Sequence, residues 1–373
     1  MTFSFVEIPT LNLSWANDSR RPRLLAQLRH ALVDVGFLYV SHHGVPEKVI
    51  ADLVRELPKL FALSKDEKQR IALHNSAHFL GYSAAGTETT AGQVDQREQV
   101  EFATEHLADW APDQPVYERL RGPNQWPDAA VIPGLRPAVE AYLDALTVLG
   151  ERFLGLVAEA LGLPADALLD FLSDQHRLKL VHYPAIDANQ VDSMGGSRQG
   201  VGPHKDSSGW WTFLLQASPP PIGGLQALNR AGDWIDVPAV PGTFVVNIGQ
   251  AFEVVTHGVC PATTHRVLVS ESERFSVPFF QGVRRDLTKT EALGAFQNHF
   301  QRNFPDRILG SGNAPLSVHV ESEESRQIDS PFLRGRYETW GESQLRTKVR
   351  SHRDVGARFY ADVFEKYIHD DDA

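Results

Sequence analysis

The chain has 373 residues, 42% of them hydrophobic, which is enough to bury a large core in one large domain or two smaller ones. Its formal net charge of −11, with no basic stripe of Lys and Arg, disfavours a nucleic-acid partner and favours a small-molecule substrate. No apolar run approaches the roughly 18 residues of a membrane span, the first residues show no secretory signal, and the single cysteine, Cys260, is typical of a reducing cytoplasm.

The first part of the chain, residues 1–175, is predicted to be mainly helical. Leucines and a valine share one face over residues 20–35, which predicts an amphipathic helix. The run Gly36–Val40 then predicts a buried strand, and a second helix is expected over residues 46–62. The longest helical period covers residues 134–161 and is closed by a glycine and a proline.

After residue 175 the pattern changes from helical to strand-like. Short apolar or alternating runs follow one another between Gly, Pro, Asn or Asp, which indicates a sandwich or barrel of antiparallel strands. Helical character returns near residues 287–300 and 341–368, so the fold class is mostly β with flanking α. The six predicted strands are Leu178–Tyr183, Trp210–Gln216, Gly224–Leu228, Thr243–Ile248, Arg266–Ser270 and Phe275–Phe280.

His204 and Asp206 are the first candidate metal ligands. In a strand, residues i and i+2 point to the same side, so both side chains are expected to face inward with Lys205 turned away. Imidazole and carboxylate suit a divalent ion, and without a cysteine set a structural zinc site is disfavoured. Two histidines and one carboxylate that meet in space form the ligand set of a non-haem Fe(II) oxygenase, which leaves three coordination positions open.

Two histidines compete to be the third ligand. His257 precedes a glycine and resembles a loop position, whereas His265 begins an apolar strand that we expect to pair with the strand at residues 274–280. The sequence pattern favours His265 as the third metal ligand, and His257 remains the alternative.

Arg274 and Ser276 are also an i, i+2 pair. A guanidinium grips a carboxylate through two hydrogen bonds and a hydroxyl adds a third, so the pair is a candidate site for an anionic co-substrate; a surface arginine in a strand is the alternative. Phe280 continues the same face and is a candidate wall of the substrate pocket. Aromatic residues in this region suggest an apolar or ring-bearing substrate, with ordinary core packing as the alternative. The further pocket candidates are Trp210, Trp211, Phe279 and His257.

A series of motifs occurs in one order along most of the chain. It includes Gly36–Pro46 (GFLYVSHHGVP), Leu60–Ser64 (LFALS), His182-Tyr183-Pro184, Gly223-Gly224-Leu225-Gln226, Gly232-Asp233-Trp234, Pro241-Gly242 and Asn247-Ile248-Gly249. In these motifs the chain resembles the isopenicillin-N-synthase-like branch of the iron/2-oxoglutarate-dependent dioxygenases, from about residue 5 to residue 282.

The resemblance implies a distorted double-stranded β-helix, or jelly roll, flanked by helices. It also implies an enzyme that uses Fe(II), 2-oxoglutarate and O2, with no catalytic side chain beyond the metal ligands. It favours His265 over His257, because His257 falls where the family usually has an asparagine before a glycine. By resemblance, the iron ligands are His204, Asp206 and His265, and the 2-oxoglutarate site is formed by Arg274, Ser276 and Tyr183.

Three parts of one compact catalytic unit are therefore expected. They are a helical N-terminal region (1–175), a jelly-roll core with both sites (176–283), and a C-terminal extension with a closing helix (284–373). Within the extension, residues 284–340 are longer than in typical members and form either a lid or a surface insertion. The segment after Asp206 is one residue longer than usual and carries the two tryptophans, which we expect to reshape the pocket mouth.

The expected activity is oxidation of a C–H bond in a small molecule of secondary (natural-product) metabolism, with release of succinate and CO2. Hydroxylation, desaturation and ring closure are all open outcomes. A same-fold iron oxidase that does not consume 2-oxoglutarate, and a non-catalytic binding module, remain alternatives. No oligomeric state is predicted.

Overall fold

Two facing β-sheets form the centre of the computed structural model, which describes residues 4–90, 93–187, 198–307, 330–334 and 336–370. The large sheet has the order β1 (Thr10–Asn12), β2 (Phe37–Ser41), β12 (Thr243–Ile248), β9 (Trp211–Gln216), β14 (Arg274–Phe280), β7 (Arg177–Tyr183), β6 (Glu98–Ala103), β3 (Gly81–Ser83). The small sheet has the order β11 (Trp234–Asp236), β10 (Leu225–Leu228), β13 (His265–Leu268), β8 (Gln199–His204). All neighbours pair antiparallel except β1 and β2, and the predicted jelly roll is confirmed.

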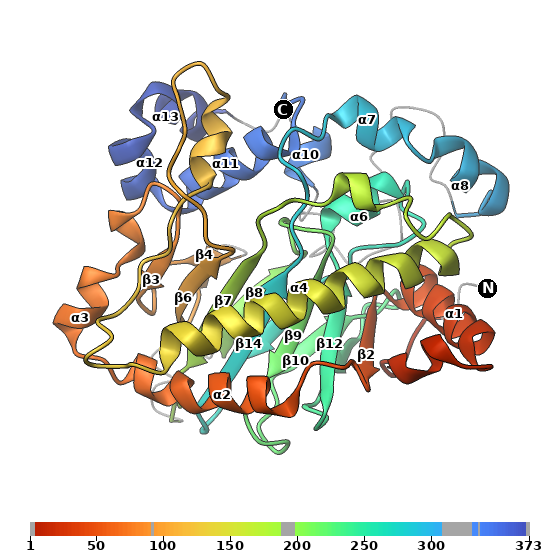
Figure 1. Ribbon diagram of the computed structural model, residues 1–373, viewed down its shortest axis with the longest axis horizontal. Helices are drawn as coiled ribbons and strands as arrows, with labels where there is room; N and C mark the ends of the chain where they lie inside the picture. The colour runs from red at the N-terminus through yellow and green to blue at the C-terminus, as the bar shows by residue number, and fades with distance from the viewer. Residues whose placement is uncertain (1–3, 91–92, 188–197, 308–329, 335, 371–373) are drawn as a thin grey trace.

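Helices cover the outer face of the large sheet. Figure 1 shows α2 (Glu47–Phe61) and α4 (Leu135–Ala160) lying across it, with α1 (Arg21–His30) beside β2. Phe153 of α4 packs its ring 5.3 Å from Trp211 and 5.4 Å from Phe213 (centroid to centroid). Strand alternation turns the intervening Thr212 and Leu214 to the opposite face. The main apolar core therefore lies outside the large sheet, and the inner face is left for the site.

The predicted N-terminal helices are confirmed with small changes. The helix predicted over residues 20–35 is α1 followed by a π-helical turn, Ala31–Val35, which ends at Gly36 with φ +75°. Strands β3 and β6 were not predicted. In β6, Val100 and Phe102 face the apolar core, whereas the inner residues Gln99 and Glu101 are buried but polar. The sequence of β6 therefore has the alternating pattern of a strand with one face exposed to solvent.

Two expectations about the strands are wrong. His265 opens β13, but β13 pairs with β8 and β10 rather than with β14, because the chain crosses from the small to the large sheet between them. Strand β8 ends at His204, so Asp206 lies just beyond it rather than within it. Lys205 does turn away, as expected, and is buried with its ammonium 3.4 Å from Glu253.

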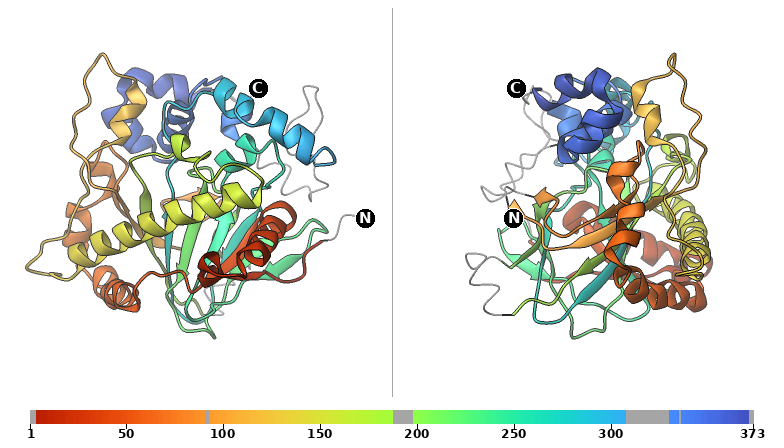
Figure 2. Two further views of the ribbon diagram at one scale, coloured as in Figure 1. Left: turned by 45° about the vertical axis from the view of Figure 1, so that its right-hand side comes forward. Right: turned by 90° about the vertical axis from the view of Figure 1, so that its left-hand side faces the viewer.

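The C-terminal segment is helical in several short pieces. Helices α11 (Trp340–Ser351), α12 (Arg353–Phe359) and α13 (Ala361–Ile368) gather at the β3–β6 end of the large sheet (Figure 2). The expected lid over residues 284–340 is described only in part, since residues 308–329 lie outside the described residues. In the described ranges, no helix is long and apolar enough to cross a membrane. The remaining elements include α3 (Lys65–Arg70), β4 (Thr89–Thr90), β5 (Gln93–Val94), α6 (Gln250–Val255), α7 (Lys289–Gly294), α8 (Gln297–Asn303) and α10 (Pro331–Arg334).

Candidate active site

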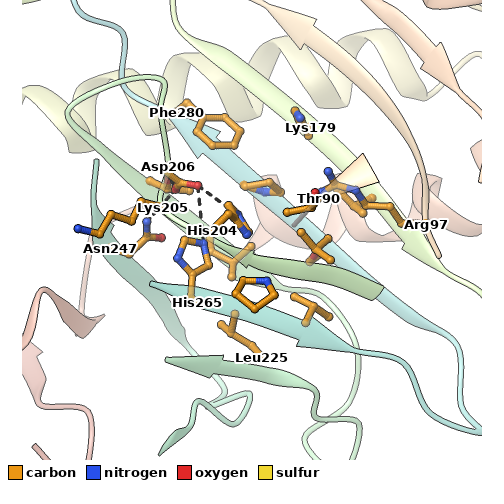
Figure 3. Close-up of a pocket in the computed structure, with 18 of the residues that line it drawn as sticks. Thr90, Arg97, Lys179, His204, Lys205, Asp206, Leu225, Asn247, His265 and Phe280 are labelled. Atoms are coloured by element: carbon orange, nitrogen blue, oxygen red, sulfur yellow. Dashed lines mark hydrogen bonds and ion pairs between the residues drawn. The ribbon is translucent and has the colours of Figure 1, made fainter. Parts of the chain in front are cut away.

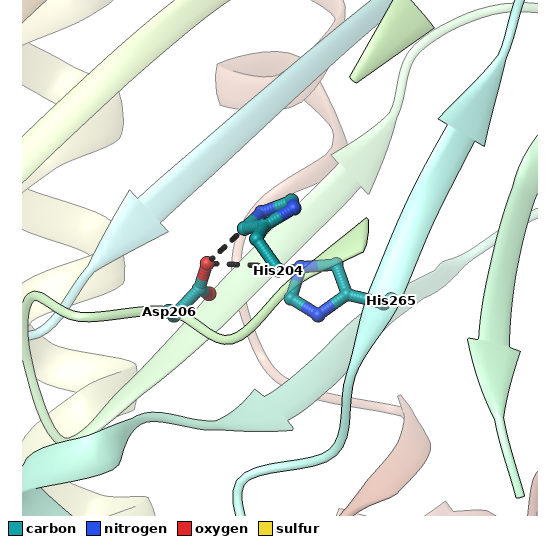
Figure 4. Close-up of side chains that lie close together, drawn as sticks. All are labelled: His204, Asp206 and His265. Atoms are coloured by element: carbon teal, nitrogen blue, oxygen red, sulfur yellow. Dashed lines mark ion pairs between the residues drawn. The ribbon is translucent and has the colours of Figure 1, made fainter. Parts of the chain in front are cut away.

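Three ligand-bearing side chains converge between the two sheets (Figure 4). His204 ends β8 and lies directly opposite His265, the first residue of β13. The Nε2 atom of each histidine lies 3.6 Å from Oδ1 of Asp206, and the three ligand atoms all lie within 4.8 Å of one another. Atoms that bind one ion at about 2.1 Å lie roughly 3 Å apart when they share a face of it. The donor set therefore fits a ferrous ion with little rearrangement.

Each histidine is held by its other ring nitrogen. Nδ1 of His204 donates to the carbonyl oxygen of Gly202 (2.8 Å), and Nδ1 of His265 donates to that of Thr263 (3.1 Å). A carbonyl only accepts, so both rings carry the proton on Nδ1 and direct a lone pair from Nε2 toward the gap. Burial, reinforced by His204, lowers the pKa of His265 to about 4, so the ring is neutral and able to bind metal at pH 7.

Asp206 is oriented by two hydrogen-bond donors. Burial by itself would raise the pKa of Asp206, but the two histidines and the Thr212 hydroxyl hold it well below its usual range. Oδ2 accepts from Thr212 Oγ1 and from Asn247 Nδ2 (2.7 Å), which leaves Oδ1 facing the histidines. Thr212 and Asn247 were not predicted as site residues, although Asn247 lies in one of the family motifs.

Replacing Asn247 with alanine is expected to weaken Fe(II) binding by roughly 10- to 100-fold, because the carboxylate ligand loses the partner that orients it. An anaerobic Fe(II) titration of the folded variant measures this change. Asn229→Ala is the matched control, since Asn229 is also a buried, hydrogen-bonded asparagine but lies in the turn between β10 and β11. Equal Fe(II) affinity in the two variants would contradict the role given to Asn247.

A cavity of about 910 Å³ surrounds the three ligands (Figure 3). Phe280 and Lys179 of the large sheet lie on one side of it, and His265 and Leu225 of the small sheet lie on the other. The inner face of β14 contributes every second residue, as the sequence predicts: Arg274, Ser276, Pro278 and Phe280.

Arg274 is a buried cation that faces this cavity. It is 3% exposed, and Tyr183 lies opposite it on β7 with its ring centroid 5.1 Å from the guanidinium carbon. Nη2 donates to Gln216 Oε1 (3.2 Å), whereas Nη1 is buried and has no hydrogen-bond partner among the described residues. Burial lowers the pKa of Arg274, which reflects the cost of keeping the charge away from water. The guanidinium therefore fits an incoming carboxylate.

The predicted tryptophans do not line the cavity. Trp210 and Trp211 are fully buried in the outer core, and the Trp210 ring packs 5.8 Å from Phe171 and 5.5 Å from Phe252. Phe279 is buried on the same side. The segment before β9 turns at Gly209, whose φ is +94° and where a Cβ would meet the backbone oxygen of Gln281 at 2.6 Å. The expectation of a pocket mouth shaped by tryptophan is thus wrong. Trp211, on β9, faces Phe153 of α4, and Trp210, just before the strand, packs against Phe171 and Phe252.

His257 is also away from the metal group. It follows α6 with φ +53°, is 8% exposed, and makes a hydrogen bond with the backbone of Leu293 in α7. It lines none of the described cavity around the three ligands. Its placement among the pocket candidates is therefore wrong.

Several polar residues of the cavity wall were not predicted. Apart from Ser207 and Ser208, which follow Asp206, they come from segments far apart in the sequence, so no local pattern joins them to the metal ligands. Phe37 packs its ring edge 5.3 Å from His265. The polar lining includes Thr90, Arg97, Lys179, Gln199, Ser207, Ser208 and Thr347.

Comparison with known proteins identifies the family. Residues 175–283 match the family described as "2OG-Fe(II) oxygenase superfamily", and residues 8–129 match "non-haem dioxygenase in morphine synthesis N-terminal". The chain is 40% identical over 365 residues to the 2-oxoglutarate-dependent dioxygenase frbJ of Dothideomycetidae sp. (strain 11243), covering 95% of this chain and 92% of that protein. The chain therefore belongs to the 2OG-Fe(II) oxygenase superfamily, and it is a dioxygenase with Fe(II) as cofactor and 2-oxoglutarate as co-substrate.

Other relatives are more distant. Homoarginine-6-hydroxylase 2-ODD-C23 of Glycine max is 29% identical over 81% of this chain and 93% of its own length. The crystal structure of a full-length Neurospora crassa protein in complex with alpha-KG and thymine has a TM-score of 0.65 at 22% identity and covers 75% of this chain and 87% of that one. This structure supports the fold. The resemblance to the isopenicillin-N-synthase-like branch is confirmed.

Proposed function

We propose that the enzyme oxidises a C–H bond of a small molecule of secondary metabolism, by hydroxylation, desaturation or ring closure. The observation that supports it best is a single cavity that holds both the His204–Asp206–His265 group and the unpartnered Nη1 of Arg274. One group suits a ferrous ion and the other suits the far carboxylate of 2-oxoglutarate. A cytoplasmic location is proposed from the single buried cysteine, Cys260.

When bound, the ferrous ion and 2-oxoglutarate supply the oxidising chemistry: O2 is consumed, 2-oxoglutarate becomes succinate and CO2, and the substrate gains one oxygen atom or loses two hydrogens. Within the protein, His204, Asp206 and His265 would hold the ion. Arg274 and Ser276 hold the far carboxylate of the co-substrate, with Tyr183 beside them. Apolar residues of both sheets, Val181, Leu214, Leu225 and Val267, exclude water from the reaction site.

Relatives indicate which substrates are worth testing. The name of the Glycine max relative states that it hydroxylates homoarginine, an amino acid, and the crystal of the Neurospora crassa protein contains thymine. Both are small polar molecules. This supports a polar small-molecule substrate, with or without a ring, rather than an apolar one.

Succinate release tests the proposed reaction. With an oxidised substrate present, the enzyme is expected to form about one succinate for each product molecule, because co-substrate decarboxylation and substrate oxidation are coupled. Succinate is measured by mass spectrometry beside O2 uptake. Product formation with O2 uptake but without succinate would refute the proposal in favour of an oxidase that takes all its electrons from the substrate.

A further inference from the structure

A second cavity of about 710 Å³ adjoins the metal cavity. The two cavities share Thr90, Lys179, Ser207, Ser208, Phe280 and Thr347 in their linings, so they adjoin one another at these side chains. None of the residues assigned to iron or 2-oxoglutarate lines this second cavity. It is therefore space available to the substrate.

The second cavity is locally basic in an acidic chain. Among the described residues that line it, five are Lys or Arg and three are Asp or Glu, although the whole chain has a net charge of −11. The positively charged side chains surround Glu101, a carboxylate on β6 that is 3% exposed. Three cations share this one carboxylate: Arg177, Lys179 and Lys348.

One of the three cations, Arg177, has its charge partner and hydrogen-bond acceptors within the protein. Arg177 pairs with Glu101 and donates further hydrogen bonds to the backbone carbonyl oxygens of Phe79 and His78. Arg177 and Glu101 therefore neutralise each other within the fold. The surplus positive charge belongs to Lys179 and Lys348.

The two lysines reach the cavity from different parts of the chain. Lys348 extends from α11 with Nζ 3.0 Å from Glu101 Oε1, and burial followed by the nearby Arg177 lowers the pKa of Lys348 to about 8. Lys179 extends from β7 with Nζ 3.9 Å from Glu101 Oε2, which is beyond hydrogen-bond distance. The next carboxylate in this wall, Glu88, is already matched by Arg97 at 2.7 Å. An additional anion between the lysines would offset their charge.

The position of Lys179 separates this site from the co-substrate site. Lys179 lies four residues before Tyr183 on the same face of β7, so it is about 13 Å along the strand from the Arg274 position. Its ammonium is 6.0 Å from the ring centroid of Phe280, which pairs on β9 with Thr212, the hydrogen-bond partner of Asp206. Lys179 on β7 and Thr212 on β9 therefore lie on strands two spacings, or about 10 Å, apart.

We propose that Lys179 and Lys348 bind a carboxylate group of the substrate, so that the enzyme acts on a small carboxylic acid, amino acids included. Because the strands that carry Lys179 and Thr212, the hydrogen-bond partner of Asp206, lie about 10 Å apart, we expect the oxidised carbon to be several bonds from that carboxylate. This assignment rests on the proposed function, and it makes helix α11, in the C-terminal segment, part of the substrate site. Thr347, one residue before Lys348, lines both cavities.

Paired compounds test the proposal on the full chain loaded with Fe(II) and 2-oxoglutarate under anaerobic conditions. The probes are the twenty proteinogenic L-amino acids and homoarginine, each beside its carboxamide, and binding is measured by calorimetry. We expect acids that bind to do so roughly 10- to 100-fold more tightly than their amides, as a charge-assisted hydrogen bond implies. In Lys179→Gln and Lys348→Gln this preference should fall to near unity, while the Kd of 2-oxoglutarate stays unchanged.

Lys68→Gln is the matched control. Lys68 also pairs with a glutamate of β6, its Nζ lying 2.9 Å from Glu98, but on the side of the strand opposite to Glu101. This variant should keep the preference for acids. Amides that bind as well as acids, no binding by any acid, or an unchanged preference in folded Lys179→Gln would each overturn the assignment.

Sodium formate is added in a separate experiment. If formate enhances the binding of amides, the site holds a free anion and the proposal is wrong. Oxidation of a bound acid without succinate would refute the proposed function alone.

Discussion

Replacing His265 with alanine is expected to abolish both iron binding and turnover. The change removes one of three ligands and leaves His204 and Asp206, which cannot hold one face of the ion. The loss should exceed the roughly 100-fold that removal of an outer partner such as Asn247 causes. Iron content after anaerobic reconstitution, together with succinate formation, measures the effect.

His257→Ala provides a strict comparison for this experiment. His257 is about as buried as His265, at 8% and 7% exposed, and lies eight residues earlier in the chain, but it contacts α7 rather than the metal group. We expect this variant to bind one equivalent of iron. Full iron occupancy in folded His265→Ala, or its loss in His257→Ala, would show that the ligand set is wrong.

Replacing Arg274 with alanine is expected to raise the KM for 2-oxoglutarate by roughly 10- to 100-fold, because each hydrogen bond to a charged group contributes about 1.5–3 kcal/mol. Fe(II) binding should be retained, since Arg274 contacts Gln216 and Tyr183 rather than a metal ligand. Arg274→Lys should give an intermediate value, since lysine keeps the charge but loses the planar fork. Initial rates at varied 2-oxoglutarate concentration measure each KM.

Arg266→Ala is the control, because it also removes an arginine from a strand that contributes to the site. Arg266 follows His265 on β13 but points outward, where its guanidinium carbon lies 3.9 Å from the ring centroid of Trp234. The KM for 2-oxoglutarate should not change in this variant. If Arg274→Ala also left this KM unchanged, the co-substrate carboxylate would have to bind elsewhere.

The features predicted correctly from the sequence are those with a local period. The i, i+2 rule placed Arg274, Ser276 and Phe280 on one face, and alternating runs located most strands of the jelly roll. Pairing partners were not predictable in the same way: β13 joins β8 across some sixty residues of sequence, and no local pattern encodes which sheet a strand enters.

Side-chain chemistry alone also misled at two places. Trp210 and Trp211 are large and aromatic, which fits a ligand pocket as well as a core, and only the packing of α4 and α6 decides between these environments. Strand β6 was missed for the opposite reason: Gln99 and Glu101 are polar, which suggests exposed positions, but both are buried. Lys348 escaped notice because helix α11 returns to the site from far along the chain.

The late position of α11 has a consequence for synthesis on the ribosome. Chains are made from the N-terminus, so the three iron ligands are complete at His265, well before Trp340 begins the helix whose Gln344 hydrogen-bonds to the backbone of Ser207 beside the metal. A chain that ends before Trp340 is therefore expected to lack one wall of the cavities, including Thr347 and Lys348, although all three iron ligands have been made.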